Sequence, residues 1–140
     1  MLKFNKLKIM EAHELMIGNT IDKGTIVNML ESGVHVGYGK CYTYDEISPI
    51  PLTEEWLLRF GFSEETQYYS DNLSLFWLDI HKSLENSEFY IFFNTETKYI
   101  GLHSMENENN ISKYLYDIKY IHQLQNLYFA LTGTHLILNK

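Results

Sequence analysis

The chain has 140 residues, of which 45% are hydrophobic and 15% aromatic, and its formal net charge is −7. This composition excludes a disordered chain, and no apolar run is long enough to span a membrane. Cys41 is the one cysteine and the N-terminus lacks the pattern of a secretory signal, so we expect a globular, cytoplasmic protein without disulfides.

Residues 15 to 48 contain short apolar runs separated by turn signals. These signals are Asp22 to Gly24, Glu31 to Gly33 and Gly37 to Gly39. Short strands joined by glycine-containing turns are typical of antiparallel sheets. We predict a small antiparallel sheet here, or an SH3-like barrel if the strands close on each other.

The next stretch, PIPLTEEWLLRFGF at positions 49 to 62, predicts an exit from the sheet and a short helix over 53 to 60. The prolines lack the amide donor that a strand ladder needs. Thr53 is a good N-cap, and the two glutamates after it favour the N-terminal end of a helix dipole. Gly61 can adopt the left-handed conformation that ends a helix.

Residues 72 to 103 predict strands, because they hold apolar runs of strand length that are rich in aromatic residues. These runs are NLSLFWLDI (72 to 80), EFYIFFN (88 to 94) and TKYIGLH (97 to 103). We expect the last two runs to form a hairpin, connected by Thr95 and Glu96.

The last segment, residues 112 to 132, has the period of a helix, with Ser112 as its cap and Gly133 as its stop. THLIL, at positions 134 to 138, follows as a closing edge strand. One arc of this helix is apolar: Tyr120, Ile121, Leu124, Leu127, Tyr128 and Leu131. Together the elements predict one α+β domain over residues 1 to 140.

The negative charge is concentrated in one part of the sequence. Between Cys41 and Asp79 there are eight acidic residues and one basic residue, Arg59, so this part alone carries −7. The sequence has no basic cluster beyond Lys3, Lys6 and Lys8, so we expect no direct binding to nucleic acid. The acidic segment either faces solvent or meets a basic protein surface.

The sequence shows no pattern of a catalytic or metal site. Its six histidines are scattered, and none is spaced for a known metal motif. Cys41 has no proton acceptor at a recognisable spacing, and we expect it to be buried or on an edge strand. For His122 we expect a structural role. We therefore predict no enzyme activity, no catalytic residue, no metal and no cofactor.

Aromatic residues between positions 68 and 99 have three interpretations. They can form a platform for base stacking, pack in the core, or serve a protein interface, where Tyr and Trp are enriched. Because few Lys and Arg residues flank them, we favour the core for most of them and an interface for the remaining tyrosines.

Three segments carry a resemblance: ELMIGNTI (14 to 21), ISPIPLTEEWLLRFGF (47 to 62) and KYIHQLQNLYFALTGTHL (119 to 136). They resemble a group of small phage and prophage proteins of Bacteroidetes. The shared residues fall in the turns, caps and helix described above, so they indicate a scaffold. The resemblance leaves residues 63 to 111 unmatched, and we expect the specific function there.

The resemblance implies an inhibitor of a host defence protein, and specifically an anti-CRISPR protein that acts on a type VI-B RNA-guided ribonuclease. We expect no membrane partner, and contact with guide RNA stays open. The predicted partner-binding residues are Glu64, Glu65, Tyr68, Tyr69, Asp71, Trp77, Tyr90 and Tyr99. The alternative is a phage accessory structural or regulatory module that binds peptide or nucleic acid through residues 15 to 48.

Overall fold

The computed structural model describes residues 10–66, 74–80, 89–94, 100–104, 111–114 and 118–139. Contacts between residues group the chain into two compact units. The first contains residues up to Pro51 together with 120–127, and the second contains 52–119 together with 128–140. Both units therefore draw on two separate parts of the sequence.

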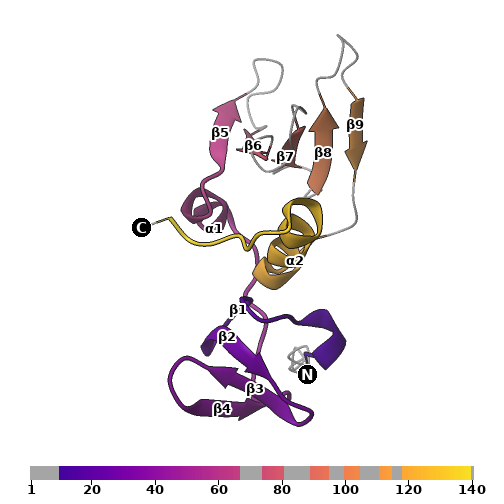
Figure 1. Cartoon of the computed structure of the whole chain (residues 1–140). Helices are drawn as coiled ribbons and strands as arrows, with labels where there is room; N and C mark the ends of the chain where they lie inside the picture. The colour runs from indigo at the N-terminus through magenta and orange to yellow at the C-terminus, as the bar shows by residue number, and fades with distance from the viewer. Residues whose placement is uncertain are drawn as a thin grey trace, which may run out of the picture. The chain divides into compact units, whose positions relative to one another are not determined.

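The first unit contains a four-stranded antiparallel sheet in the order β1-β2-β3-β4 (Figure 1). A short 3-10 helix, Ala12–Glu14, precedes it. The strands are β1 (Thr20–Ile21), β2 (Gly24–Met29), β3 (Gly33–Val36) and β4 (Lys40–Thr43). Each joins the next at a predicted turn. β1 and β4 are the two ends of the sheet order, so of the two predicted forms the antiparallel sheet is the one observed.

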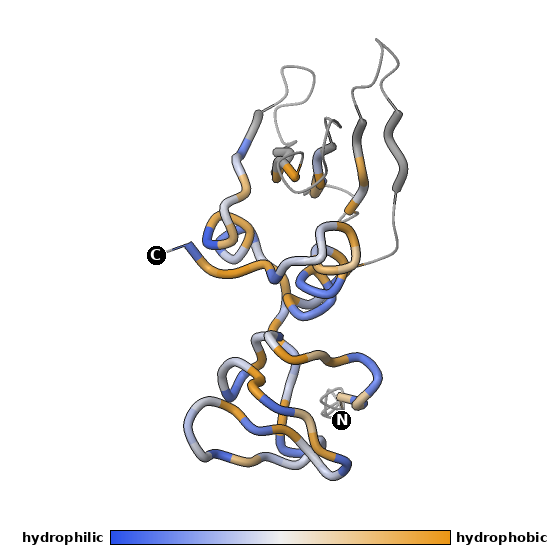
Figure 2. The backbone as a smooth tube through the Cα atoms, in the orientation of Figure 1, coloured by the Kyte–Doolittle hydropathy of each residue, from blue (hydrophilic) through white to orange (hydrophobic). Residues whose placement is uncertain are grey.

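One face of this sheet covers a hydrophobic core. The core residues are Met10, Leu15, Ile21, Ile26, Val34, Val36 and Ile47. Figure 2 shows that hydrophobic residues of β2 and β3 are interrupted by hydrophilic ones, as a half-buried sheet requires. The pairing of β2 with β3 shifts register between Ile26 and Asn28, which explains why the alternation along β2 is irregular.

The predicted short helix is confirmed as α1, Glu54–Arg59, in the second unit. Thr53 is its N-cap, and its hydroxyl oxygen accepts a hydrogen bond from the Trp56 amide at 3.4 Å. At the other end Gly61 has a φ of 91°. The Gly61 amide donates to the Leu58 carbonyl and the Phe62 amide to the Leu57 carbonyl, each at 3.0 Å, which is the Schellman pattern.

Replacing Thr53 with alanine is expected to lower the free energy of unfolding of the second unit by about 1 kcal/mol, because one amide of the first helical turn loses its acceptor. Urea unfolding followed by tryptophan fluorescence measures this, since both tryptophans, Trp56 and Trp77, belong to that unit. Thr53→Ser keeps the hydroxyl and should unfold like the parent chain. Equal losses in both variants would contradict the capping role.

The second unit also contains a five-stranded antiparallel sheet in the order β5-β6-β7-β8-β9. Its strands are β5 (Ser63–Thr66), β6 (Ser74–Asp79), β7 (Phe89–Asn94), β8 (Ile100–Ser104) and β9 (Ile111–Tyr114). Phe76, Phe93 and Ile100 lie opposite one another on adjacent strands and are all buried. This row of side chains forms the core face of the sheet, and the α+β class is confirmed.

The predicted hairpin is present as β7 and β8, but the two-residue connection is wrong. Phe93 pairs with Ile100, so residues 94 to 99 lie between these partners. A turn at Thr95 and Glu96 would instead have set Lys98 opposite the buried Phe93. Burial of Ile100 on the core face favours the observed register, because a lysine in that position would lose its hydration.

The C-terminal helix is also present, but it begins later than predicted. α2 runs over Ile121–Thr132, whereas Ile111–Tyr114 form β9 and pair with β8. The segment has a helical period, but its Ile and Tyr residues also have high β propensity. The edge of β8 offers backbone hydrogen bonds to this segment, and these favour the strand. The predicted cap Ser112 is therefore a strand residue.

The predicted closing strand over 134 to 138 is wrong. These residues follow α2 without strand pairing, and the segment is held at its end by the Asn139 amide, which donates to the Arg59 carbonyl at 2.8 Å. Leu136 is buried, so the segment contributes to the core through this side chain rather than through a ladder of hydrogen bonds.

Candidate functional site

The segments that carry the resemblance meet in the first unit through side-chain amides. Asn19 is buried, and its Nδ2 donates to Asn126 Oδ1 at 2.8 Å. Its Oδ1 accepts from the Met16 amide at 2.9 Å. Asn126 Nδ2 in turn donates to the Glu14 carbonyl at 2.9 Å. The asparagines thus fasten the 14–21 segment to α2.

Gln125, the residue before Asn126, forms a second set of hydrogen bonds between α2 and this segment. Its Oε1 accepts from the Thr20 amide at 2.8 Å, and its Nε2 donates to the Thr20 hydroxyl at 3.2 Å. The side-chain amide therefore binds β1 much as a neighbouring strand would. Sequence reasoning missed this network, because α2 carries several polar residues and the sequence does not show which of them meet the 14–21 segment.

The proline segment joins the same helix through its backbone. The Ile121 amide donates to the Ile50 carbonyl at 3.0 Å, and Pro51 forms an isolated antiparallel bridge with Tyr120. Gln123 Oε1 accepts from the Tyr120 amide at 3.1 Å, which is the returning half of a capping box and fixes the start of α2. These residues position the chain, as the scaffold interpretation expects.

His122 belongs to this junction. It is buried, and its ring stacks on Tyr120 with a centroid separation of 5.8 Å and an angle of 17°. The side chain therefore packs where the proline segment meets the helix.

The second unit gathers aromatic side chains on the face of its sheet opposite the core. Trp77 lies between Tyr90, at a centroid distance of 6.2 Å, and Phe92, at 5.5 Å. The Trp77 and Tyr90 rings are nearly perpendicular, at 88°, which is a favourable edge-to-face arrangement. We call Trp77, Tyr90 and Phe92 the aromatic cluster.

The register explains the cluster. Trp77 pairs with Phe92 across β6 and β7, and Tyr90 lies two positions from Phe92 along β7, so all three share one face. The opposite face carries Leu78, which lines a hollow of about 260 Å³ together with Phe60 and Leu136. The aromatic cluster is thus turned away from α1 and the C-terminal segment. Trp77 and Tyr90 are half-buried, while Phe92 is buried.

Of the predicted partner-binding residues, the structure brings Trp77 and Tyr90 together. Glu64 is exposed, but it pairs with Phe76 and so lies on the core side of the edge strand β5. Glu65 pairs with Leu75 in the backbone ladder. The other four residues lie outside the described residues: Tyr68, Tyr69, Asp71 and Tyr99. Phe92 is the member of the cluster that sequence reasoning did not select.

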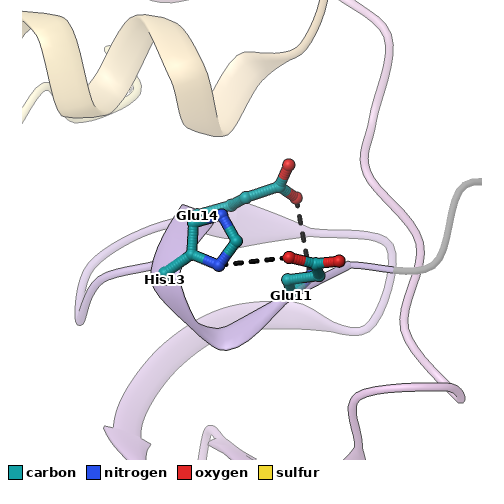
Figure 3. Close-up of polar contacts among 3 residues, drawn as sticks. All are labelled: Glu11, His13 and Glu14. Carbon is teal, nitrogen blue, oxygen red and sulfur yellow. Dashed lines mark hydrogen bonds and ion pairs between the residues drawn. The ribbon is translucent and has the colours of Figure 1, made fainter.

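Two smaller candidates have local explanations. In the 3-10 helix, His13 Nδ1 lies 3.2 Å from Glu11 Oε2, and the Glu11 amide donates to Glu14 Oε2 at 3.5 Å (Figure 3). These exposed contacts cap one helical turn. Within the described ranges, no three His, Cys, Asp or Glu side chains are grouped as a metal site. Cys41 is exposed on the edge strand β4.

Comparisons with protein-family models, curated proteins and solved structures gave no match to this chain. Among the residues that the structure describes, the helices are too short or too polar to cross a membrane.

Proposed function

We propose that the protein is a non-enzymatic inhibitor of phage origin, which binds a host defence protein through the aromatic cluster of the second unit. The observation that carries this proposal is the grouping of Trp77, Tyr90 and Phe92 on the sheet face opposite the core. It lies in the part of the sequence that the scaffold motifs do not cover.

The cluster has the properties of an interface anchor. Tryptophan and tyrosine provide large contact areas with few rotatable bonds, and they are enriched among the residues that dominate binding energy. The Trp77 ring contacts both Tyr90 and Phe92, which restrains it, so little conformational entropy is lost on binding. The half-buried state of Trp77 and Tyr90 leaves apolar surface that a partner can cover.

The charge of the acidic segment favours a basic partner. Residues 41 to 79 carry the whole net charge of −7. Glu64 is exposed on the edge strand β5, on the face opposite the cluster, so it adds to the charge of the second unit but not to the cluster's own face. A surface that handles RNA is rich in Lys and Arg, and complementary potentials speed the encounter with such a surface. For the partner we propose a type VI-B RNA-guided ribonuclease, on the strength of the motif resemblance.

Replacing Trp77 with alanine is expected to weaken binding to the ribonuclease about thirtyfold, or about 2 kcal/mol, because the largest ring of the anchor is removed. The measurement is the affinity of the purified chain for the guide-loaded ribonuclease, together with inhibition of RNA cleavage. Trp56→Ala is the matched control, since Trp56 is half-buried in the same unit and stacks on Arg59 at 4.1 Å.

The experiment tests separately whether the aromatic cluster binds the partner and whether electrostatic attraction contributes to the affinity. Undiminished inhibition by Trp77→Ala would contradict the role of the aromatic cluster. Affinity that does not fall with added salt would contradict the electrostatic contribution. Capture from host lysate with and without RNase shows whether guide RNA takes part in the complex.

The second candidate function is an accessory phage module that binds peptide or nucleic acid through residues 15 to 48. A hollow lined by two lysines in the first unit favours it. The two functions differ in the tyrosine on which binding depends. The inhibitor requires Tyr90, whereas the accessory module requires Tyr38, so Tyr90→Ala and Tyr38→Ala tested against the same captured partner distinguish them.

A further inference from the structure

The first unit has a hollow of about 480 Å³ that the inhibitor proposal does not use. It lies where β2 begins and the turn between β3 and β4 passes, within the range of about 300–1,000 Å³ that is usual for ligand pockets. We call it the lysine groove. The lining residues that matter here are Lys23, Gly24, Val27, Val36, Tyr38 and Lys40.

The two basic residues of this region line one groove. Between positions 10 and 51 the sequence has two basic residues, Lys23 and Lys40, and six acidic ones, which gives 2 − 6 = −4. Both basic residues line the same groove, although they are far apart in sequence. The sheet brings them together, because Val36 pairs with Lys40 on one side and with Ile26 of β2 on the other.

The ammonium groups are accessible. Lys23 Nζ lies 3.8 Å from an Asp22 carboxylate oxygen, and its side chain keeps 38% of its surface exposed. It also lies 5.7 Å from the centroid of the Tyr42 ring, which holds it beside β4. Lys40 is exposed. An exposed pair such as Lys23 with Asp22 is weak, so an anionic ligand can compete for the lysine.

Apolar surface adjoins the two cations. Tyr38 is fully exposed at the tip of the turn, between Gly37 with a φ of 59° and Gly39 with a φ of 84°. Val27 is 50% exposed, because it follows the buried Ile26 along β2 and so faces outward. Two cations beside an exposed aromatic ring and an aliphatic side chain suit a ligand that is both anionic and apolar.

We propose that the lysine groove binds an extended acidic segment of a partner protein. Carboxylates of that segment pair with Lys23 and Lys40, and a neighbouring apolar side chain packs on Val27 and Tyr38. The charge of the groove argues against nucleic acid, because the two lysines that line it neutralise few phosphates and an Asp22 carboxylate oxygen lies 3.8 Å from one of them. A peptide, unlike nucleic acid, can carry negative charges only at the positions that face Lys23 and Lys40.

This inference refines the second candidate function, which uses the same hollow. It concerns a different unit from the inhibitor proposal and its test uses no ribonuclease, so the inference and the inhibitor proposal can fail independently. The full chain is immobilised and used to select from a displayed library of random short peptides. The selected peptides and an oligouridine RNA are then titrated against the chain and against three variants: Lys23→Gln, Lys40→Gln and Tyr38→Ala. Lys119→Gln is the matched control, with the same loss of charge outside the groove.

Selected peptides should be enriched in Asp and Glu next to a large apolar residue. Their affinity should fall about tenfold in each lysine variant, fall with added salt, and stay unchanged in Lys119→Gln. Selection without acidic enrichment, failure to select any peptide, or binding of oligouridine in place of peptides would overturn the proposal. So would equal effects of Lys23→Gln and Lys119→Gln.

Discussion

Replacing Asn19 with alanine is expected to lower the free energy of unfolding of the first unit by about 3 kcal/mol, because the Met16 amide and Asn126 Oδ1 both lose their partner. Asn19 is 1% exposed. Its side chain accepts from the Met16 amide and donates to Asn126 Oδ1. Alanine can do neither.

Amide hydrogen exchange measures this loss in the first unit itself. The amides of the buried residues Ile26 and Val34 should lose protection by roughly a hundredfold, the factor that corresponds to about 3 kcal/mol. Asn28→Ala is the matched control, since Asn28 is exposed on β2 and bonds only the next amide, that of Met29. A similar loss in both variants would show that the asparagine network does not stabilise the unit.

A double-mutant cycle measures how much of this stabilisation comes from the bond between Asn19 and Asn126. If Asn19 and Asn126 stabilise the unit through their mutual bond, Asn126→Ala should cost much less once Asn19 is already alanine. A coupling of about 1–2 kcal/mol is expected for two side chains in one hydrogen-bond network. Strictly additive losses would mean that each asparagine acts only through its backbone partners.

This network is an example of contacts that could not be predicted from the sequence. The caps and stop of α1 were predictable, because Thr53, the two glutamates and Gly61 act on residues a few positions away. The turns of the first sheet were predictable for the same reason. By contrast, Asn19 and Asn126 are distant in sequence, and a polar residue on a helix gives no local indication of its partner.

The start of the C-terminal helix could not be predicted for a related reason. The segment from 112 onward has an acceptable helical period, but Ile111–Tyr114 pair with β8 instead. Local propensity is a weak guide where an unpaired strand edge offers a complete ladder of hydrogen bonds. The helix therefore begins at Ile121, after the bridge between Pro51 and Tyr120.

The candidate site was predictable in part. Trp77 and Tyr90 were selected as aromatic residues on neighbouring strands, and they do contact each other. Their face depends on register, which also sets Glu64 beside Phe76 on the core side rather than beside Trp77. The lysine groove was not predicted, because it depends on which residues of β2, β3 and β4 are neighbours.

Replacing Gly33 with alanine is expected to destabilise the first unit by about 3 kcal/mol or more, because β3 and β4 approach too closely at this position for a side chain. A Cβ atom on Gly33 would overlap the carbonyl oxygen of Tyr42 and lie 2.9 Å from the Thr43 Cα. Both contacts are with backbone, so no side-chain rotation can relieve them. The strands would have to separate where Gly33 pairs with Thr43.

Gly37→Ala is the matched control for this substitution. Gly37 lies at the other end of β3 with a φ of 59°, and a Cβ atom there would meet nothing within 4 Å. Alanine at Gly37 should therefore cost only about 1 kcal/mol, from the left-handed backbone conformation. Hydrogen exchange of the Val34 and Val36 amides measures both variants. A loss for Gly33→Ala that is no larger than the loss for Gly37→Ala would contradict the close approach of β3 and β4 as the reason for the glycine at position 33.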